Sequence, residues 1–181
     1  MLFQTRAYGS DSVRAFGGNP RRPPLQPNAS KIEKQVLFIK NFRHILDQEA
    51  HGLTGKLQRL SLDQRRRILS AACQLASQTV GGVEPRFQEL VKAAERGVLS
   101  QAQITEARLL ADLADEQYFT LQNNGAAEAE WLSWFSKARL LTAIAAGFGG
   151  DSWSDTADAV YELCRIRDDP SEILNLIESL L

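Results

Sequence analysis

The chain has little of what disulfide-rich domains, metal sites and membrane spans are built from. Its two cysteines, Cys73 and Cys164, lie far apart and form neither a CxxC motif nor a disulfide framework. Histidine occurs twice, and no apolar run approaches the roughly 20 residues that a membrane-spanning helix needs. The start of the chain lacks the apolar core of a secretory signal. These absences favour a cytoplasmic protein with reduced thiols and no membrane-spanning segment.

Strand signals are also absent, whereas helical signals fill most of the sequence. From Ser30 onward apolar residues recur every three or four positions, and no alternating pattern competes with this period. Ser61 with Gln64 and Ser100 with Gln103 form capping-box pairs that mark helix starts. The chain has 181 residues, of which 44% are hydrophobic, enough to bury one core. We therefore predict an all-α bundle or layered array of about seven helices, forming a single domain over residues 30–181.

The helical pattern breaks at glycines, asparagines and prolines, which sets the expected helix boundaries. The expected helices cover residues 30–50, 61–80, 84–97, 100–123, 126–146, 152–167 and 170–180. The second half of the fifth, LLTAIAAGF, is apolar nearly all round. A helix of this kind belongs in the middle of a core.

Residues 1–29 differ from the rest and are predicted to form an extended arm. They hold most of the prolines, several glycines and no sustained apolar period. Scattered apolar side chains occur at Leu2, Phe3, Tyr8, Val13, Phe16 and Leu25. These side chains indicate that the arm docks on a surface. The stretch RRPPLQP also places Arg21, Pro24 and Pro27 at the spacing of polyproline ligands.

Charge is distributed unevenly, although the formal net charge is only -1. Residues 1–67 hold 13 basic and 5 acidic side chains, a net +8, whereas residues 68–150 hold 6 and 9, a net -3. Residues 151–181 hold 2 and 8, a net -6. This asymmetry predicts either an anionic partner for the basic end or docking of the two ends on each other, within or between subunits.

Two groups of side chains are candidates for contact with a partner. The basic group is Arg14, Arg21, Arg22, Lys56, Arg59, Arg65, Arg66 and Arg67. Nucleic-acid phosphates or an acidic protein surface would both attract it. The protein surface is favoured because successive arginines on a helix diverge by about 100° and the arm is only sparsely basic. The apolar group is Leu109 and Leu113, which lie away from the apolar stripe of their helix and either pack under a second helical layer or form an interface.

The stretch GFGGDSWSD, residues 147–155, has the outline of a phosphate-binding loop. Such a loop needs a preceding strand and a lysine after its last glycine, and both are missing from this sequence. We interpret Gly147, Gly149 and Gly150 as left-handed residues that stop one helix, with Asp151 or Ser152 capping the next.

Metal-binding patterns are incomplete in the same way. His44, Asp47 and His51 share one helix face, but the two histidines are separated by about 10 Å of helical rise and cannot both ligate one ion. Asp112 and Asp115 lack the histidine partner of di-iron bundles. We therefore predict no catalytic residues, no cofactor and no metal.

The sequence carries no motif that assigns it to a known family. We expect a helical protein-interaction module, either an adaptor or an assembly subunit, that binds through a basic N-terminal arm and a charge-complementary surface. The expected partner is another protein or a second copy of the chain, and not a membrane. The alternatives are a nucleic-acid-associated accessory protein and, third, a helical enzyme with an unrecognised site.

Overall fold

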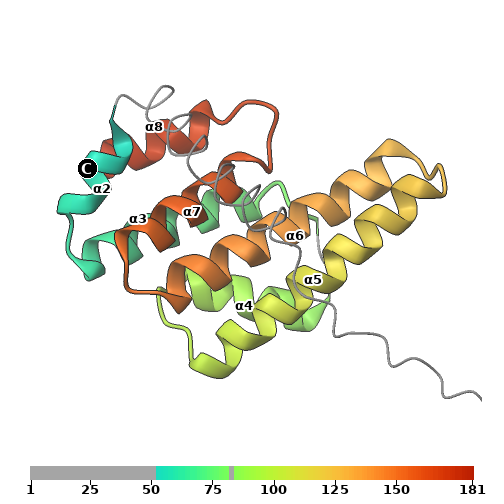
Figure 1. The fold of residues 1–181 in the computed structure, drawn as a ribbon, viewed down its shortest axis with the longest axis horizontal. Helices are drawn as coiled ribbons and strands as arrows, with labels where there is room; N and C mark the ends of the chain where they lie inside the picture. The colour runs from blue at the N-terminus through green and yellow to red at the C-terminus, as the bar shows by residue number, and fades with distance from the viewer. Residues whose placement is uncertain (1–51, 82–83) are drawn as a thin grey trace, which may run out of the picture.

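The computed structural model describes residues 52–81 and 84–181, and it confirms the all-α fold (Figure 1). The described part contains seven helices and no strand. They are α2 (Leu53–Arg59), α3 (Leu62–Ser77), α4 (Pro85–Glu95), α5 (Gln101–Asn123), α6 (Glu128–Gly149), α7 (Trp153–Cys164) and α8 (Ser171–Leu180). The predicted arm, the helix expected over residues 30–50 and the domain boundary between them lie outside the described residues.

Helix α6 is the centre of the fold, as its apolar second half predicts. It packs against α3, α4, α5 and α7. Leu140, Ile144 and Phe148 are at most 5% exposed, and most of their neighbours on α6 are buried too. Because this half of α6 is covered on all sides, the other helices take their positions from it.

Helices α5 and α6 form a long antiparallel hairpin that extends beyond the other helices (Figure 1). Gly125 makes the turn between them, with a left-handed φ of 70° that favours glycine. No residue from 115 to 137 is fully buried. The outer half of the hairpin is therefore only two helices thick, whereas its base belongs to the core.

Local capping signals predict several helix starts correctly. Ser61 and Gln64 at α3, and Ser100 and Gln103 at α5, each form the reciprocal hydrogen bonds of a capping box. Pro85 takes the first turn of α4, where its missing N–H costs nothing.

Helix α2 is a correction, because the expected helices 30–50 and 61–80 leave residues 51–60 without a helix. Only Gly52 is left-handed, with φ 80°, and a helix begins directly after it and includes Gly55. Leu53 and Leu57 are 0% exposed, and α2 packs on α7. Burial of these two leucines outweighs the low helix propensity of the glycine.

The glycines after Ala146 are a second correction. Gly147 and Gly149 are part of α6, and Gly150 is extended at φ -122°, so none of the three is left-handed. A Cβ atom on Gly147 would lie 2.5 Å from Leu69 Cδ1 and 2.9 Å from Ala159 Cβ. Glycine is therefore needed here for close approach of α6 to α3 and α7. The helix-to-helix connection itself is confirmed, because Ser152 caps α7 with a capping box.

We expect Gly147→Ala to lower the free energy of unfolding by about 1–3 kcal/mol, because the new methyl group overpacks the contact with Leu69 and Ala159. Gly55→Ala is the matched control, since it also lies inside a helix but has no atom within 4 Å of the added Cβ. It should stabilise the protein by about 0.5–1 kcal/mol. Urea unfolding followed by circular dichroism measures both. Stabilisation by both substitutions would contradict the packing argument.

Candidate functional site

Leu109 and Leu113 are exposed on α5, at 60% and 55% of their full accessible area. The stripe of α5 that packs into the core is Ile104, Ala107 and Ala111, on the other side of the helix. The sequence left open whether these leucines pack under a second helical layer or form an interface. Within the described residues no helix covers them. Two exposed leucines one helical turn apart form an apolar ridge.

This ridge borders a cavity of about 630 Å³ between the start of α4 and the facing sides of α5 and α6. The apolar side chains in its walls are Phe87, Leu110, Leu113, Ala114 and Leu141. Leu113 belongs to both the ridge and the wall. The exposed apolar surface therefore continues from the outside of α5 into a hollow.

Trp134 and Lys137 complete the α6 wall of this cavity. The Lys137 ammonium lies 3.0 Å from a Glu84 carboxylate oxygen and 4.5 Å from the centroid of the Trp134 ring. Only 12% of the Lys137 side chain is exposed. Glu84 and the indole ring balance the charge of Lys137, so the α6 wall suits an apolar ligand, while Arg86 adds an exposed cation on the α4 side.

A second cavity, of about 450 Å³, continues toward the hairpin tip. Its walls are Leu121, Ala129, Glu130, Ser133 and Trp134. Trp134 borders both cavities. We call the two cavities together the hairpin groove.

The outer half of the hairpin carries acidic side chains and no basic ones between residues 116 and 136. Residues 116–136 contain three glutamates, Glu116, Glu128 and Glu130, all exposed, and no lysine or arginine. Asp112 is also exposed on α5, beside Leu109 and Leu113. The hairpin therefore attracts a basic partner through charge, while its groove offers apolar contacts.

This groove was not predicted from the sequence, because its walls come from three helices whose packing no local pattern indicates. One signal was present in the sequence. The segment from Tyr118 to Phe135 holds five aromatic residues but no lysine or arginine. An aromatic and acidic stretch of this kind is unusual for a solvated helix surface, because aromatic side chains have large apolar areas that favour burial.

The structure gives Arg65, one of the predicted contact residues, a role inside the fold. It is 8% exposed, and its guanidinium donates to the backbone oxygens of Leu60 at 2.7 Å and Asp151 at 2.6 Å. Arg65 thereby connects the start of α3 to the loop before α7.

Lys56 and Arg66 form ion pairs with the acidic C-terminal part of the same chain. The Lys56 ammonium lies 3.1 Å from Glu178, and the Arg66 guanidinium lies 3.3 Å from Asp151. The exposure of these four side chains limits each pair to a small contribution to stability. Part of the charge asymmetry is therefore balanced within one chain.

The other predicted basic residues fall into two groups. Arg59 and Arg67 are exposed and form no ion pair among the described residues. Arg67 borders a polar cavity of about 540 Å³ together with Arg66 and Arg96. Arg14, Arg21 and Arg22 lie outside the described residues.

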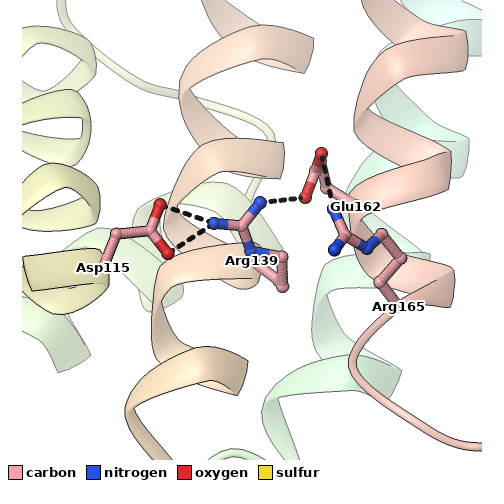
Figure 2. Close-up of polar contacts among 4 residues, drawn as sticks. All are labelled: Asp115, Arg139, Glu162 and Arg165. Carbon is pink, nitrogen blue, oxygen red and sulfur yellow. Dashed lines mark hydrogen bonds and ion pairs between the residues drawn. The ribbon is translucent and has the colours of Figure 1, made fainter. Parts of the chain in front are cut away.

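A buried charge network connects three helices at the base of the hairpin (Figure 2). Arg139 on α6 donates to both carboxylate oxygens of Asp115 on α5 at 2.6 Å, and to Glu162 on α7 at 2.9 Å. Arg165 lies 3.8 Å from the same Glu162. Figure 2 shows the Arg139 side chain between the two carboxylates, so it holds both neighbouring helices to α6.

The electrostatics of Arg139 show that this network is structural. Burial alone would lower the pKa of its guanidinium, but Glu162 and Asp115 outweigh that effect and raise the pKa. The Arg139 side chain is 12% exposed and that of Glu162 is 15% exposed. The charges in this network face one another, so little of the Arg139 and Glu162 side chains is accessible to a ligand.

The remaining candidates for chemistry are few in the part of the chain that the structure describes. No cluster of three or more potential metal-ligating side chains occurs there, and none of its helices has the length and apolar character to cross a membrane. His44, Asp47 and His51 lie outside that part. Cys73 and Cys164 are buried and do not form a disulfide with each other. Comparison with protein-family models, with curated proteins and with solved structures gave no match.

We expect Arg139→Met to lower the free energy of unfolding by about 1–3 kcal/mol, because it leaves the Asp115 carboxylate without its cation and Glu162 with only the more distant Arg165. Arg86→Met is the control. The Arg86 side chain is 80% exposed and lies 3.9 Å from Glu106, so its loss should change stability by less than about 0.5 kcal/mol. Equal effects of the two substitutions in urea unfolding would count against a structural network.

Burial, with a smaller contribution from Glu95, raises the pKa of the Cys73 thiol from 9.0 to about 12. Between these values the unfolded chain loses the proton that the folded chain keeps, so stability falls as the pH rises. The loss attributable to this thiol approaches about 1.4 kcal/mol per pH unit. We expect Cys73→Ala to flatten the decline in stability that urea unfolding measures between pH 9 and pH 11. The same decline in both proteins would show that other groups cause it.

Proposed function

We propose that this protein is a helical protein-interaction module that acts as an assembly subunit in the cytoplasm, with a second copy of the chain as its partner. The observation that carries the proposal is the apolar ridge of Leu109 and Leu113 beside the cavity of about 630 Å³ in the hairpin groove. Exposed apolar patches next to a concave surface are typical of protein interfaces.

A second copy supplies both charges that such a contact needs. Residues 1–67 hold 13 basic and 5 acidic side chains, whereas the outer half of the hairpin holds Glu116, Glu128 and Glu130 without any lysine or arginine. The basic end of one chain is therefore complementary to the hairpin of another. Charge steers the encounter, and the leucines with the groove provide the lasting contact.

Two further observations support this assignment. The two cysteines are buried and form no disulfide with each other, which suits a reducing compartment such as the cytoplasm. We propose no catalytic role, because the largest ion-pair cluster, around Arg139, directs its charges at its own members.

Nucleic-acid binding is the second candidate, and the cavity bordered by Arg66, Arg67 and Arg96 favours it. Three arginines around one hollow would attract phosphate. However, Asp63 and Glu95 contribute to the same walls and oppose that attraction. Because of these acidic side chains, we favour a protein partner over nucleic acid.

Light scattering on the full chain over a range of concentrations tests the proposal. We expect the mass to rise with concentration in the wild type and to remain monomeric in the double variant Leu109→Glu/Leu113→Glu. Leu180→Glu is the matched control, because Leu180 is 49% exposed on α8, away from the hairpin groove, and it should assemble normally.

Two results would overturn the assembly proposal. One is a monomer at every concentration in the wild type. The other is tight binding to a fluorescent oligonucleotide, with an affinity that falls linearly in log salt, by a monomeric protein. Unchanged circular dichroism melts must accompany the variants, so that loss of assembly is not loss of fold.

A further inference from the structure

We propose that the segment of this chain that occupies the hairpin groove is residues 21–27, RRPPLQP, with its prolines packed beside Trp134. This inference rests on the proposed function for the partner copy, and it adds which part of the chain forms the contact. Four observations carry it: the chemistry of the groove, the spacing along it, its charge and the reach of the chain.

The groove has the features that proline-rich segments bind. Such segments favour a polyproline II conformation and dock on aromatic-lined surfaces, because proline rings pack well on aromatic faces without losing much conformational entropy. Trp134 borders both cavities of the groove, and Leu110, Leu113 and Leu141 extend the apolar surface on one side of it. The pairing of Lys137 with Glu84 keeps this surface near neutral.

The spacing of the segment matches the length of the groove. In polyproline II every third residue lies on one edge, so Arg21, Pro24 and Pro27 share an edge that is about 19 Å long at 3.1 Å per residue. Ala129 and Leu141 mark the two ends of the α6 wall and are separated by about 18 Å of helical rise. Pro24 at the middle of the edge then falls near Trp134.

Charge fixes the direction of the segment. Glu130 is exposed in the wall of the cavity at the hairpin tip, whereas the wall at the other end, around Phe87 and Leu141, includes the exposed Arg86, which repels a second arginine. The arginine end of the segment is therefore expected beside Glu130, and the Pro27 end beside Phe87. An arginine beside a carboxylate at one end of an apolar groove gives a proline-rich ligand its orientation.

The chain is long enough for this contact. Twenty-four residues separate Pro27 from Gly52, where the described structure begins, and with residues 30–50 helical, as the sequence predicts, they span about 45 Å. Helix α5, with 23 residues, is about 35 Å long. The connection therefore permits the segment to reach the groove of its own chain or of another copy.

The competing occupant is the amphipathic stretch 30–50, which the sequence predicts to be a helix. That stretch directly precedes α2, and α2 lies at the end of the molecule away from the hairpin tip (Figure 1). It also carries four basic and three acidic side chains, so it is less complementary to the acidic hairpin than the arm, which carries four basic residues and one acidic residue. Both observations favour residues 21–27.

Fluorine NMR of the full chain labelled with 5-fluorotryptophan tests the inference, because the chain has three tryptophans. Trp134 reports on the groove, and Trp153, at the start of α7, reports on the fold elsewhere. We expect the Trp134 signal to shift in Pro24→Ala/Pro27→Ala and in Arg21→Glu/Arg22→Glu, while the Trp153 signal stays in place. A synthetic peptide of residues 17–29 should return the Trp134 signal of the proline variant to its original position in a saturable way.

The control is Arg6→Glu, which reverses a charge in the arm outside the segment and should leave the Trp134 signal unchanged. An unchanged Trp134 signal in the proline variant would overturn the inference. So would a Trp134 shift caused by Ile39→Glu alone, with Trp153 unchanged, because it would identify stretch 30–50 as the occupant.

The same samples separate this inference from the proposed function. If Trp134 responds to the arm variants in a chain that stays monomeric, the segment occupies the groove of its own chain, and the assembly proposal fails while the inference stands. If the Trp134 signal is unchanged in the arm variants but Leu109→Glu/Leu113→Glu still abolishes assembly, the proposed function stands and the inference fails.

Discussion

The fold depends on the close approach of α6 to α3 and α7 at Gly147. The side chains of Leu69 and Ala159 occupy the space that a larger residue would need there, so interior packing sets how deep α6 lies. With that end held in the core, α6 serves as the platform for α5, and the two helices continue outward together (Figure 1). Arg139 adds a polar connection from the same helix to α5 and α7. The position of the hairpin groove follows from this arrangement.

Local signals in the sequence predict the helices well because caps, breaks and apolar periods act over a few residues. Ser61, Ser100 and Ser152 each begin a helix as their side chains indicate. The wrong predictions concern residues whose backbone conformation depends on contacts with distant parts of the chain. Gly55 and Gly147 are helical because of what their helices pack against. The partners of Arg139 lie 24 and 23 residues away, and no pattern in a single helix indicates them.

The candidate site shows the same division. The position of Leu109 and Leu113 away from the core stripe could be predicted because it depends on the face of one helix, whereas their exposure depends on whether other helices cover that face. The groove beside them could not be, since its walls come from α4, α5 and α6. The basic residues are also divided by long-range contacts: Arg65 is buried, Lys56 and Arg66 pair within the chain, and Arg67 remains free to meet another molecule. The amino-acid composition does not distinguish these basic residues from one another.

The outer half of the hairpin, in which no residue from 115 to 137 is fully buried, has a consequence for motion. Segments with few buried contacts open by local unfolding, at a much lower free energy than the whole domain. We therefore expect the backbone amides near Gly125 to exchange with solvent faster than those of the α6 base. A ligand that fills the groove suppresses this local unfolding. Part of its binding free energy is therefore spent on ordering the hairpin. The hairpin is thereby suited to a reversible contact, one that forms and releases without disturbing the core.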